Sequence, residues 1–324
     1  ESRRPLLLIG HGGSSSAASA EVLSVAEKAQ IPVITTLLGI GGLSGEHVLC
    51  LGMPGMHGEA HNNWAIDRSD LIIGVGMRFD DRVTGKLSAF APNAKVIHVD
   101  IDPAEVGKNV RVTVPIIGDA KAVMAALARE VDSASRDEWL AEIEALRREH
   151  AVPLPETDKL LPQRVVQELS NATDGRAIIV TGVGQHQMWA AQNYRFREPR
   201  SWITSGGLGT MGFEVPAAMG AAFARPDRVV WSIAGDGGFQ MTMSELATIV
   251  ENNVPVKFAI LNNNNLGLVR QLQDLFYDGV RVASNYTGNP DFTKLAAAYG
   301  IWALRVEDTA GIRLSLIHIS APTR

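Results

Sequence analysis

The chain has 324 residues, of which 46% are apolar and 20% charged, and its formal net charge is -5. This length favours two domains, and the composition, with 31 glycines, is typical of a globular α/β protein. The acidic balance argues against a nucleic-acid-binding protein, which normally carries a basic face. Cys50 is the only cysteine, so an intrachain disulfide is excluded and a reducing compartment is expected.

The amino-terminal residues predict neither a membrane anchor nor a signal peptide. No apolar run approaches the roughly 18 residues that a membrane span needs. The apolar stretch from Leu6 to Ile9 stops at Gly10, and no small-residue cleavage pattern follows it. We expect a first strand here, and the missing initial Met indicates a fragment of a longer protein.

Residues 1–135 alternate short apolar runs with helical patterns, and residues 16–29 are predicted as a helix. The predicted strands are residues 6–9, 32–36, 71–75, 96–99 and 114–117. Continuous apolar strands separated by helices indicate a doubly wound parallel sheet. Such sheets bind ligands at the carboxyl ends of their strands, which here carry glycines 10–13 and 74–76 and acidic residues 100–102.

Residues 136–162 are predicted to link the first domain to a second one. The polar stretch from Arg136 to Glu149 favours a helix, and three prolines follow it at positions 153, 155 and 162. Residues 163–309 then repeat the alternation, with predicted strands at 177–181, 229–234 and 257–262, so a second doubly wound parallel sheet is expected. Residues 310–324 continue no earlier pattern. They resemble a translated sequencing adapter and are expected to be a non-native tail, with a genuine terminus as the alternative.

Two predicted strands of the second domain end in residues that suit a divalent cation. One runs into Gly235-Asp236-Gly237-Gly238, and the next runs into four asparagines, 262–265. The helix between them is the crossover, and residues 242–245 have the form of a capping box. Asp236 and Asn263 should therefore meet at neighbouring strand ends, where carboxylate and amide oxygens suit Mg²⁺ and the glycines let backbone N–H groups approach phosphates. The alternative is a tight turn beside an exposed loop.

These two motifs resemble the signature of the thiamine-diphosphate enzymes, in which Gly-Asp-Gly closes one strand and paired Asn closes the next. The resemblance implies that Asp236 and Asn263 bind the metal, together with the backbone carbonyl of Asn265. It implies cofactor contacts from Gly184, Gln185, His186, Gly209, Met211, Gly235, Gly237 and Gly238. Met211 would wedge between the two cofactor rings. Taken alone, Met211 would more often fill a core gap and His186 more often cap or support a structure.

Within that superfamily, residues 4–305 look like the catalytic subunit of acetolactate (acetohydroxyacid) synthase. The most specific segments are residues 55–58, 76–85, 185–192 and 205–212. The resemblance implies decarboxylation of pyruvate and its ligation to a second pyruvate, giving 2-acetolactate, or to 2-oxobutyrate, giving 2-aceto-2-hydroxybutyrate. This is the first common step of branched-chain amino-acid biosynthesis. Leu268 and Val269 match acceptor-side positions and join Met211 in the implied catalytic set, whereas Leu272 stands where many members carry Trp.

The same resemblance implies a structural FAD in the first domain. Its contacts would be Gly12, Gly13, Thr36, Leu37, Met56, His57, Gly76, Arg78, Asp80, Arg82, Val83, Asp100, Ile101 and Asp119. Without the family, residues 78–82 would equally suit a solvated, salt-bridged loop. His57 and His61 flank Glu59 at zinc-like spacing, but the sequence offers no third ligand.

The resemblance also implies the substrates, the partner subunits and the location of the protein, and what the chain can do alone. The substrates would be small 2-oxo acids, and the full-length protein would form a homodimer or homotetramer with a small regulatory subunit. It would be cytoplasmic in a bacterium, or plastid or mitochondrial in a eukaryote. The family's catalytic glutamate lies on a domain N-terminal to residue 1, so this chain alone is expected to be inactive. The alternatives are another thiamine-diphosphate carboligase or oxidase, such as glyoxylate carboligase or pyruvate oxidase, and a non-catalytic flavin-binding module.

Overall fold

The computed structural model describes residues 2–320, and the chain divides into two compact units. The first unit comprises Glu1–Pro153 and Arg195–Arg200, and the second comprises Leu154–Tyr194 and Ser201–Arg324. Each unit contains one parallel sheet with helices, so the predicted fold class of two doubly wound α/β domains is confirmed.

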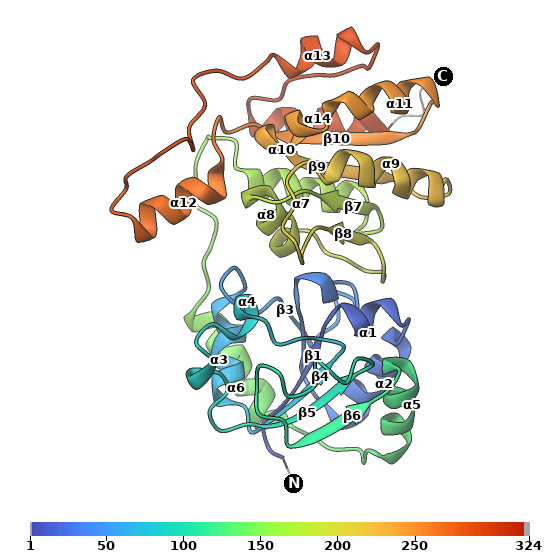
Figure 1. The fold of residues 1–324 in the computed structure, drawn as a ribbon, viewed down its shortest axis with the longest axis vertical. Helices are drawn as coiled ribbons and strands as arrows, with labels where there is room; N and C mark the ends of the chain where they lie inside the picture. The colour runs from blue at the N-terminus through green and yellow to red at the C-terminus, as the bar shows by residue number, and fades with distance from the viewer. Residues whose placement is uncertain (1, 321–324) are drawn as a thin grey trace. The chain divides into compact units, whose positions relative to one another are not determined.

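The first unit is built on a six-stranded parallel sheet with the order β3-β2-β1-β4-β5-β6 (Figure 1). Its strands are β1 (Pro5–Ile9), β2 (Val33–Thr35), β3 (Cys50–Gly52), β4 (Leu71–Val75), β5 (Lys95–Asp100) and β6 (Val114–Ile117). Its helices are α1 (His11–Ser15), α2 (Ser19–Ala29), α3 (Ala60–Arg68), α4 (Asp81–Thr84), α5 (Ala120–Glu130) and α6 (Asp137–Glu149), with short turns η1 (Leu37–Gly39) and η2 (Leu87–Ala89). The strand order reverses beside β1 and β4, which is where such sheets bind ligands.

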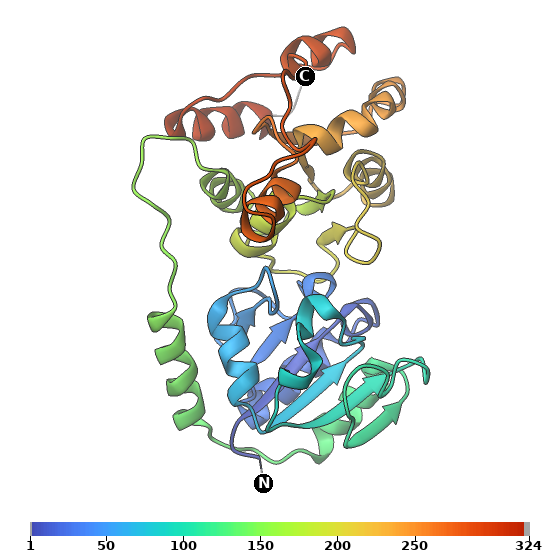
Figure 2. The ribbon, with the colours of Figure 1, turned by 60° about the vertical axis from the view of Figure 1, so that its left-hand side comes forward.

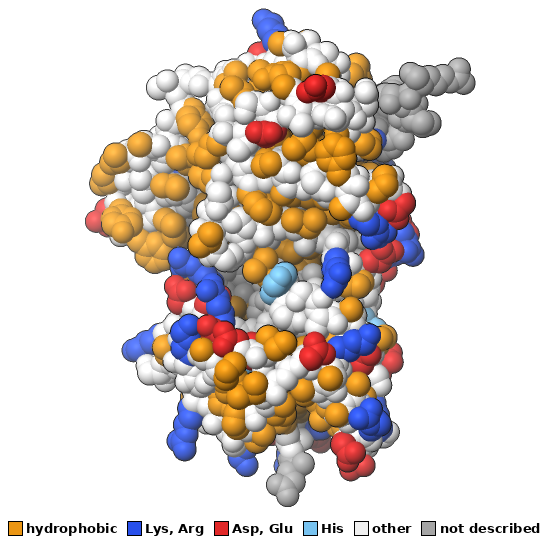
Figure 3. All heavy atoms as spheres, turned by 45° about the vertical axis from the view of Figure 1, so that its right-hand side comes forward, with side chains coloured by type: hydrophobic (Ala, Val, Ile, Leu, Met, Phe, Trp, Pro, Cys, Tyr) orange, Lys and Arg blue, Asp and Glu red, His pale blue; other side chains and the backbone are white. Residues whose placement is uncertain are grey.

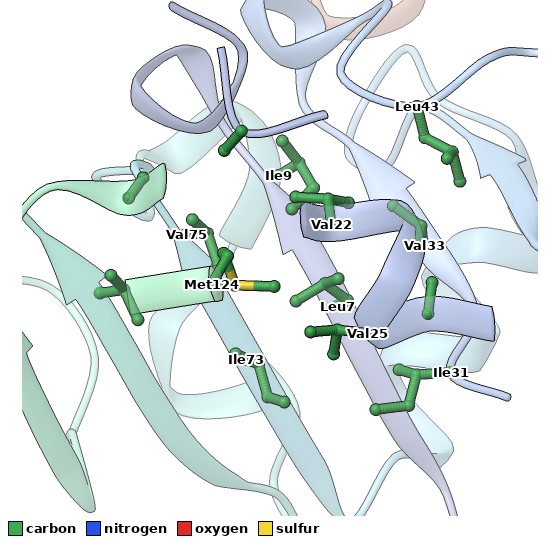
Figure 4. Packing of buried hydrophobic residues seen from close by; sticks show 14 of the residues in the cluster. Leu7, Ile9, Val22, Val25, Ile31, Val33, Leu43, Ile73, Val75 and Met124 are labelled. Atoms are coloured by element: carbon green, nitrogen blue, oxygen red, sulfur yellow. The ribbon is translucent and has the colours of Figure 1, made fainter. Parts of the chain in front are cut away.

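The core of the first unit forms where α2 and α5 cover one face of the sheet (Figure 4). Leu7 and Ile9 of β1 pack there against Val22 and Val25 of α2 and Met124 of α5, and all five are fully buried. The intervening strand residues Leu6 and Leu8 are equally buried on the opposite face. Burial on both faces explains why these strands are continuously apolar in sequence.

Residues 136–162 were expected to link the two domains. Helix α6, which lies within that range, belongs instead to the first unit. Trp139, Ile143 and Leu146 are buried at the i, i+4 and i+7 positions of one helix face. The indole Nε1 of Trp139 also donates to the carbonyl of Pro5 at 3.0 Å. Only residues 151–161, which contain no helix or strand, connect α6 to the next helix as an extended segment (Figure 2).

The second unit is built on a four-stranded parallel sheet with the order β10-β9-β7-β8. Its strands are β7 (Ile178–Thr181), β8 (Trp202–Thr204), β9 (Val230–Gly235) and β10 (Val256–Leu261). Its helices are α7 (Pro162–Ala172), α8 (Gln185–Asn193), α9 (Glu214–Ala224), α10 (Asp236–Met241), α11 (Leu246–Glu251), α12 (Gly267–Phe276), α13 (Phe292–Ala298) and α14 (Thr309–Ser320), with the short turn η3 (Met243–Glu245).

Three local expectations differ from the structure. Strands β3 and β8 were not predicted, since each has only three residues and offers little periodicity. The capping box expected at residues 242–245 is wrong, because Thr242 precedes the short turn η3 but its side chain makes no capping hydrogen bond. The hydroxyl of Thr242 donates to the carbonyl of Gly212 at 2.7 Å instead of capping.

Helix α14 covers most of the segment that was expected to be a non-native tail. It packs against α7, buries Ile312 and Leu316, and pairs Arg313 with Glu168 at 3.0 Å. The last residues of that segment, 321–324, lie outside the described residues. That the segment is non-native stays a prediction, since a packed helix does not test its origin.

The surface of the second unit is unusually apolar around α12. No residue of α12 is buried, and Leu275 and Phe276 are about two-thirds exposed. On the face that Figure 3 shows, this unit presents many hydrophobic and few charged side chains. Between residues 2 and 320, no helix has the length and apolar character that crossing a membrane requires.

Replacing Leu7 with Ala tests the core of the first unit. Because Leu7 is fully buried between two helices and the sheet, the substitution should lower the free energy of unfolding by about 3 kcal/mol. Leu87→Ala, at a half-exposed position of the same unit, should change it by less than about 0.5 kcal/mol. Urea denaturation followed by circular dichroism measures both, and equal small effects would contradict this packing.

Candidate functional site

The parallel pairing of β9 with β10 places the two predicted cation-binding motifs at one edge of the sheet. Gly235 of β9 lies opposite Leu261 of β10, so Asp236 and the asparagine run leave the sheet at the same level. Asp236 is only 2% exposed and begins α10. The sequence-based expectation that these strand ends are neighbours is therefore met by the observed register.

A pocket of about 120 Å³ at this edge gathers most of the residues that the motifs singled out. They come from the turn after β7, the loop before α9, the end of β9, the loop after β10 and the start of α12. The predicted residues that line it are Gly184, Gln185, His186, Met211, Gly235, Asp236, Gly237, Gly238, Asn263, Asn265, Leu268 and Val269, together with Leu272. Gly209 is not among them and stays a prediction.

Asp236 is a buried carboxylate held by several donors. Burial raises its pKa, while the side chain of Asn289 and the backbone N–H groups of Gly237 and Asn264 lower it. The amide Nδ2 of Asn289 lies 2.6 Å from Asp236 Oδ2. These donors partly offset the cost of burying the charge, and a bound cation would offset it further.

The asparagine run forms a tight turn that is stabilised by its own amides. Asn264 adopts a left-handed conformation, with φ of 56°, which Asn tolerates better than most residues. The side-chain Oδ1 of Asn263 accepts from the backbone N–H of Asn265 at 3.0 Å, and Oδ1 of Asn265 accepts from Arg270 at 3.0 Å. These bonds leave the carbonyl oxygen of Asn265 and a second lone pair on Asn263 Oδ1 as oxygen donors for a cation.

The ends of other side chains occupy the space that a Cβ on Gly237 or Gly238 would need. A Cβ on Gly237 would collide with the hydroxyl of Tyr286, and one on Gly238 would lie 2.7 Å from Oε1 of Glu214. Both glycines are in the first turn of α10, where backbone N–H groups have no helical partner. This arrangement suits the binding of an anion such as a diphosphate.

His186 supplies a second buried polar group in the lining of the pocket. Burial lowers its pKa to about 4, so the imidazole is neutral near physiological pH. Its Nε2 atom is buried and has no hydrogen-bond partner among the described residues. Gly184, which precedes α8, has φ of 153° and ψ of -170°, a conformation that is essentially restricted to glycine. The other ring nitrogen, Nδ1, is the one that lies beside the glycine turns at Gly184 and Gly235, so the imidazole is placed to contact a phosphate oxygen of a diphosphate cofactor there.

A larger hollow of about 1190 Å³ runs along β10 and is lined mostly by apolar residues. Of the predicted site residues, it includes only Asn263. It contains neither the glycine turns nor His186, so the smaller pocket is the better candidate for a phosphate-bearing ligand.

The first unit shows a close approach of two glycine turns at the carboxyl ends of β1 and β4. Gly76 has φ of 58°, and a Cβ there would collide with the backbone of Gly12 and Gly13. The N–H of Gly12 donates to the carbonyl of Gly76 at 2.9 Å. The glycines thus let the two turns pack closely, at the point where the strand order reverses and where sheets of this kind bind ligands.

Charged residues surround these turns, and several already have local partners. Arg78 pairs with Asp80 at 3.1 Å, and Asp80 also caps α4 by accepting from the N–H of Arg82. Arg78 and Arg82 are more than half exposed, so their charges are accessible to phosphates. The loop therefore combines this exposed charge with the local ion pairs of the alternative interpretation. Burial, and then Arg82, lowers the pKa of His57.

The other predicted flavin contacts lie on loops and at the ends of short elements of this unit. Val83 belongs to α4, Thr36 and Leu37 begin η1, Met56 precedes α3, and Asp100 and Ile101 follow one another at the end of β5. Asp119 caps α5 by accepting from the N–H of Ala122 at 2.9 Å. The zinc alternative at His57 and His61 gains no support: His61 bonds to the carbonyl of Leu51, and the described chain shows no cluster of three metal-binding side chains.

Three residues of the site were not predicted. Glu214, Tyr286 and Asn289 contact Gly238, Gly237 and Asp236, respectively. Glu214 could have been noticed as a lone charge at the start of a small-residue apolar helix. Tyr286 and Asn289 lie in an irregular segment that has no recognisable pattern.

Comparison with known proteins places both units in one enzyme class. Residues 1–127 match the thiamine pyrophosphate enzyme, central domain, and residues 182–317 match the thiamine pyrophosphate enzyme, C-terminal TPP binding domain. The chain therefore belongs to the thiamine pyrophosphate enzymes and carries two of their domains.

Similar full-length proteins narrow this class. The chain is 48% identical over 317 residues to the acetolactate synthase of Mycobacterium bovis, covering 94% of this chain and 51% of that protein. It is 44% identical over 333 residues to a probable acetolactate synthase large subunit of Methanococcus aeolicus, covering 97% of this chain and 55% of that protein. It is 45% identical over 331 residues to acetolactate synthase 1, chloroplastic, of Nicotiana tabacum, covering 98% of this chain and 49% of that protein. The chain is a homologue of acetolactate synthase large subunits, and it spans about half the length of these relatives.

Glu214 should make stability depend on pH. Burial raises the pKa of its carboxyl group from 4.5 to about 7, against smaller opposing effects of the backbone of Glu214 and Gly212. The folded state thus holds a proton that the unfolded state releases, so this contribution is fully present below pH 4.5 and is lost as the pH rises to about 7. The loss should be on the order of 3 kcal/mol.

Urea denaturation of Glu214→Gln and the unaltered chain at about pH 4.5 and about pH 8 measures this effect. In Glu214→Gln, the free energy of unfolding should not show this fall between the two pH values. Glu251→Gln, at an exposed position, should behave like the unaltered chain. The same pH dependence in all three proteins would contradict the buried, protonated state of Glu214.

Proposed function

We propose that the protein carrying this chain condenses two pyruvates to 2-acetolactate with release of CO₂, or pyruvate with 2-oxobutyrate to 2-aceto-2-hydroxybutyrate. The observation that carries the proposal is the pocket in which the ends of β9 and β10, the glycine turn after β7 and the start of α12 meet. The names of the relatives, each an acetolactate synthase or a probable one, support this reaction over other reactions of the class.

In this proposal, the second unit holds Mg²⁺ and the diphosphate of thiamine diphosphate. Asp236, Asn263 and the carbonyl of Asn265 are the metal ligands, an all-oxygen set that suits Mg²⁺. Gly237 and Gly238 donate backbone N–H groups on one side, and Gly184, Gln185 and His186 contact the far phosphate. The His186 ring, whose Nδ1 lies beside Gly184 and Gly235 in the lining of the pocket, is the observation that best supports the fit of this group.

Thiamine diphosphate, when bound, supplies the electron sink for decarboxylation and ligation. The residues of this chain orient the reactants and keep water away. Met211 enters the pocket from the loop before α9, while Leu268 and Val269 enter from α12, so the substrate side of the pocket is apolar. His186 is neutral and can donate one ring N–H to a phosphate oxygen without adding charge.

The remaining features of the proposal rest on the family. The first unit holds FAD beside the turns at Gly12, Gly13 and Gly76, with Arg78 and Arg82 beside its phosphates. The protein is a homodimer or homotetramer, and the large-subunit name of relatives supports a small partner subunit. The location is cytoplasmic in a bacterium, or plastid or mitochondrial in a eukaryote, and one relative is named as chloroplastic.

Asp236→Ala tests the metal assignment. Without the carboxylate, the Mg²⁺-dependent binding of thiamine diphosphate to this chain should be lost, since this side chain supplies the only formal charge among the proposed ligands. Titration with the cofactor at fixed Mg²⁺, followed by tryptophan fluorescence or calorimetry, measures this. Asp158→Ala, an exposed control, should bind as the unaltered chain does. Undiminished binding by Asp236→Ala would refute the assignment.

The flavin site is tested separately by the double substitution Arg78→Ala with Arg82→Ala. Removing both charges beside the glycine turns should weaken FAD binding about tenfold or more, while leaving thiamine diphosphate binding unchanged. Flavin fluorescence during titration measures the affinity, and Arg111→Ala is the matched exposed control. Unchanged FAD affinity in the double variant would contradict the assigned contacts, and flavin binding without any thiamine diphosphate binding would favour a flavin module.

A further inference from the structure

Asn289 bridges the two strand ends at the proposed cation site, although no motif singled it out. It lies on the segment between α12 and α13, far from Asp236 in sequence. Its Nδ2 atom is 2.6 Å from Oδ2 of Asp236, and it is 3.0 Å from the side-chain oxygens of both Asn262 and Asn264. One amide thus contacts the end of β9 and the turn after β10.

The orientation of this amide is set by Gln240 of α10. The Nε2 atom of Gln240 donates to Oδ1 of Asn289 at 3.1 Å and to the carbonyl of Asp236 at 2.9 Å. With its oxygen accepting from Gln240, Asn289 presents its two N–H groups to the oxygen atoms around Asp236. The bond network, rather than the position of hydrogens, assigns which end of the amide faces Asp236.

We propose that Asn289 is a positioning residue that holds the Asp236 carboxylate for the divalent cation. It binds Oδ2 through a charge-assisted hydrogen bond, which restricts rotation of the carboxylate. Groups that orient a ligating carboxylate in this way typically change metal affinity about 10- to 100-fold. This inference rests on the proposed Mg²⁺ and thiamine diphosphate site.

The same contacts explain why Asn289 should act on the cation more than on the cofactor. Asn289 does not line the pocket that holds the glycine turns and His186, whereas Asp236 does. Its effect on the diphosphate is therefore indirect, through the metal. Gln240 acts one step further away, since it orients Asn289 and contacts only the backbone of Asp236.

The experiment measures the Mg²⁺ concentration that gives half-maximal thiamine diphosphate binding to this chain. In Asn289→Ala and Asn289→Leu, this concentration should rise about 10- to 100-fold, while the affinity for thiamine diphosphate at saturating Mg²⁺ stays close to that of the unaltered chain. Gln240→Ala should shift it in the same direction by less. Thr287→Ala, at an exposed polar position of the same segment, is the control and should leave it unchanged.

Two outcomes would overturn the inference. An unchanged Mg²⁺ requirement in Asn289→Ala would show that Asp236 needs no such support. An equal loss of cofactor affinity at every Mg²⁺ concentration, with a lower melting temperature, would show a merely structural role.

Failure of the proposed function is distinguishable from failure of this inference. If the proposed function is wrong, the unaltered chain itself binds no thiamine diphosphate. In that case, direct titration with Mn²⁺ alone decides the role of Asn289. Weaker Mn²⁺ binding by Asn289→Ala than by the unaltered chain supports the inference, and equal binding overturns it.

Discussion

The parallel pairing of β9 with β10 is the constraint on which the site of the second unit depends. It brings a buried carboxylate, Asp236, to the same sheet edge as four consecutive asparagines. Neither strand end could form a cation site alone, since one offers a single charge and the other only neutral oxygens. The helical crossover between the strands fixes their order, so the chemistry follows from the topology.

The site also contains several polar groups whose burial is unfavourable without a ligand. Asp236 and Glu214 have pKa values raised by burial, and His186 has a pKa lowered by it. Such groups near glycine turns mark functional sites more often than structural cores. In the proposed enzyme, a cation offsets the charge of Asp236 and a diphosphate accepts from His186. Glu214, whose pKa is raised to about 7, is protonated at acidic pH, and its carboxyl oxygens occupy the space that a Cβ on Gly238 or Gly182 would need.

Much of this arrangement was predictable from sequence, because it depends on local rules. Apolar strands such as residues 71–75, and glycine turns at their carboxyl ends, follow from burial on both faces and from close backbone approach. Asp236 and Asn263 could be paired because parallel strands end at the same edge. Asn289 could not, since its contact with Asp236 forms through an irregular segment. Helix α6 was assigned to the linker because charged residues are spread along it. Its apolar face, formed by Trp139, Ile143 and Leu146, was therefore not recognised in the sequence.

The most direct test of the account is the crystal structure of this chain with Mn²⁺ and thiamine diphosphate, with the metal located by its anomalous signal. The account predicts one peak at the ends of β9 and β10, at roughly 2.2 Å from oxygens of Asp236 and Asn263, with the diphosphate on its other side. A metal and diphosphate bound elsewhere in the second unit, with Asp236 turned away from both, would contradict it.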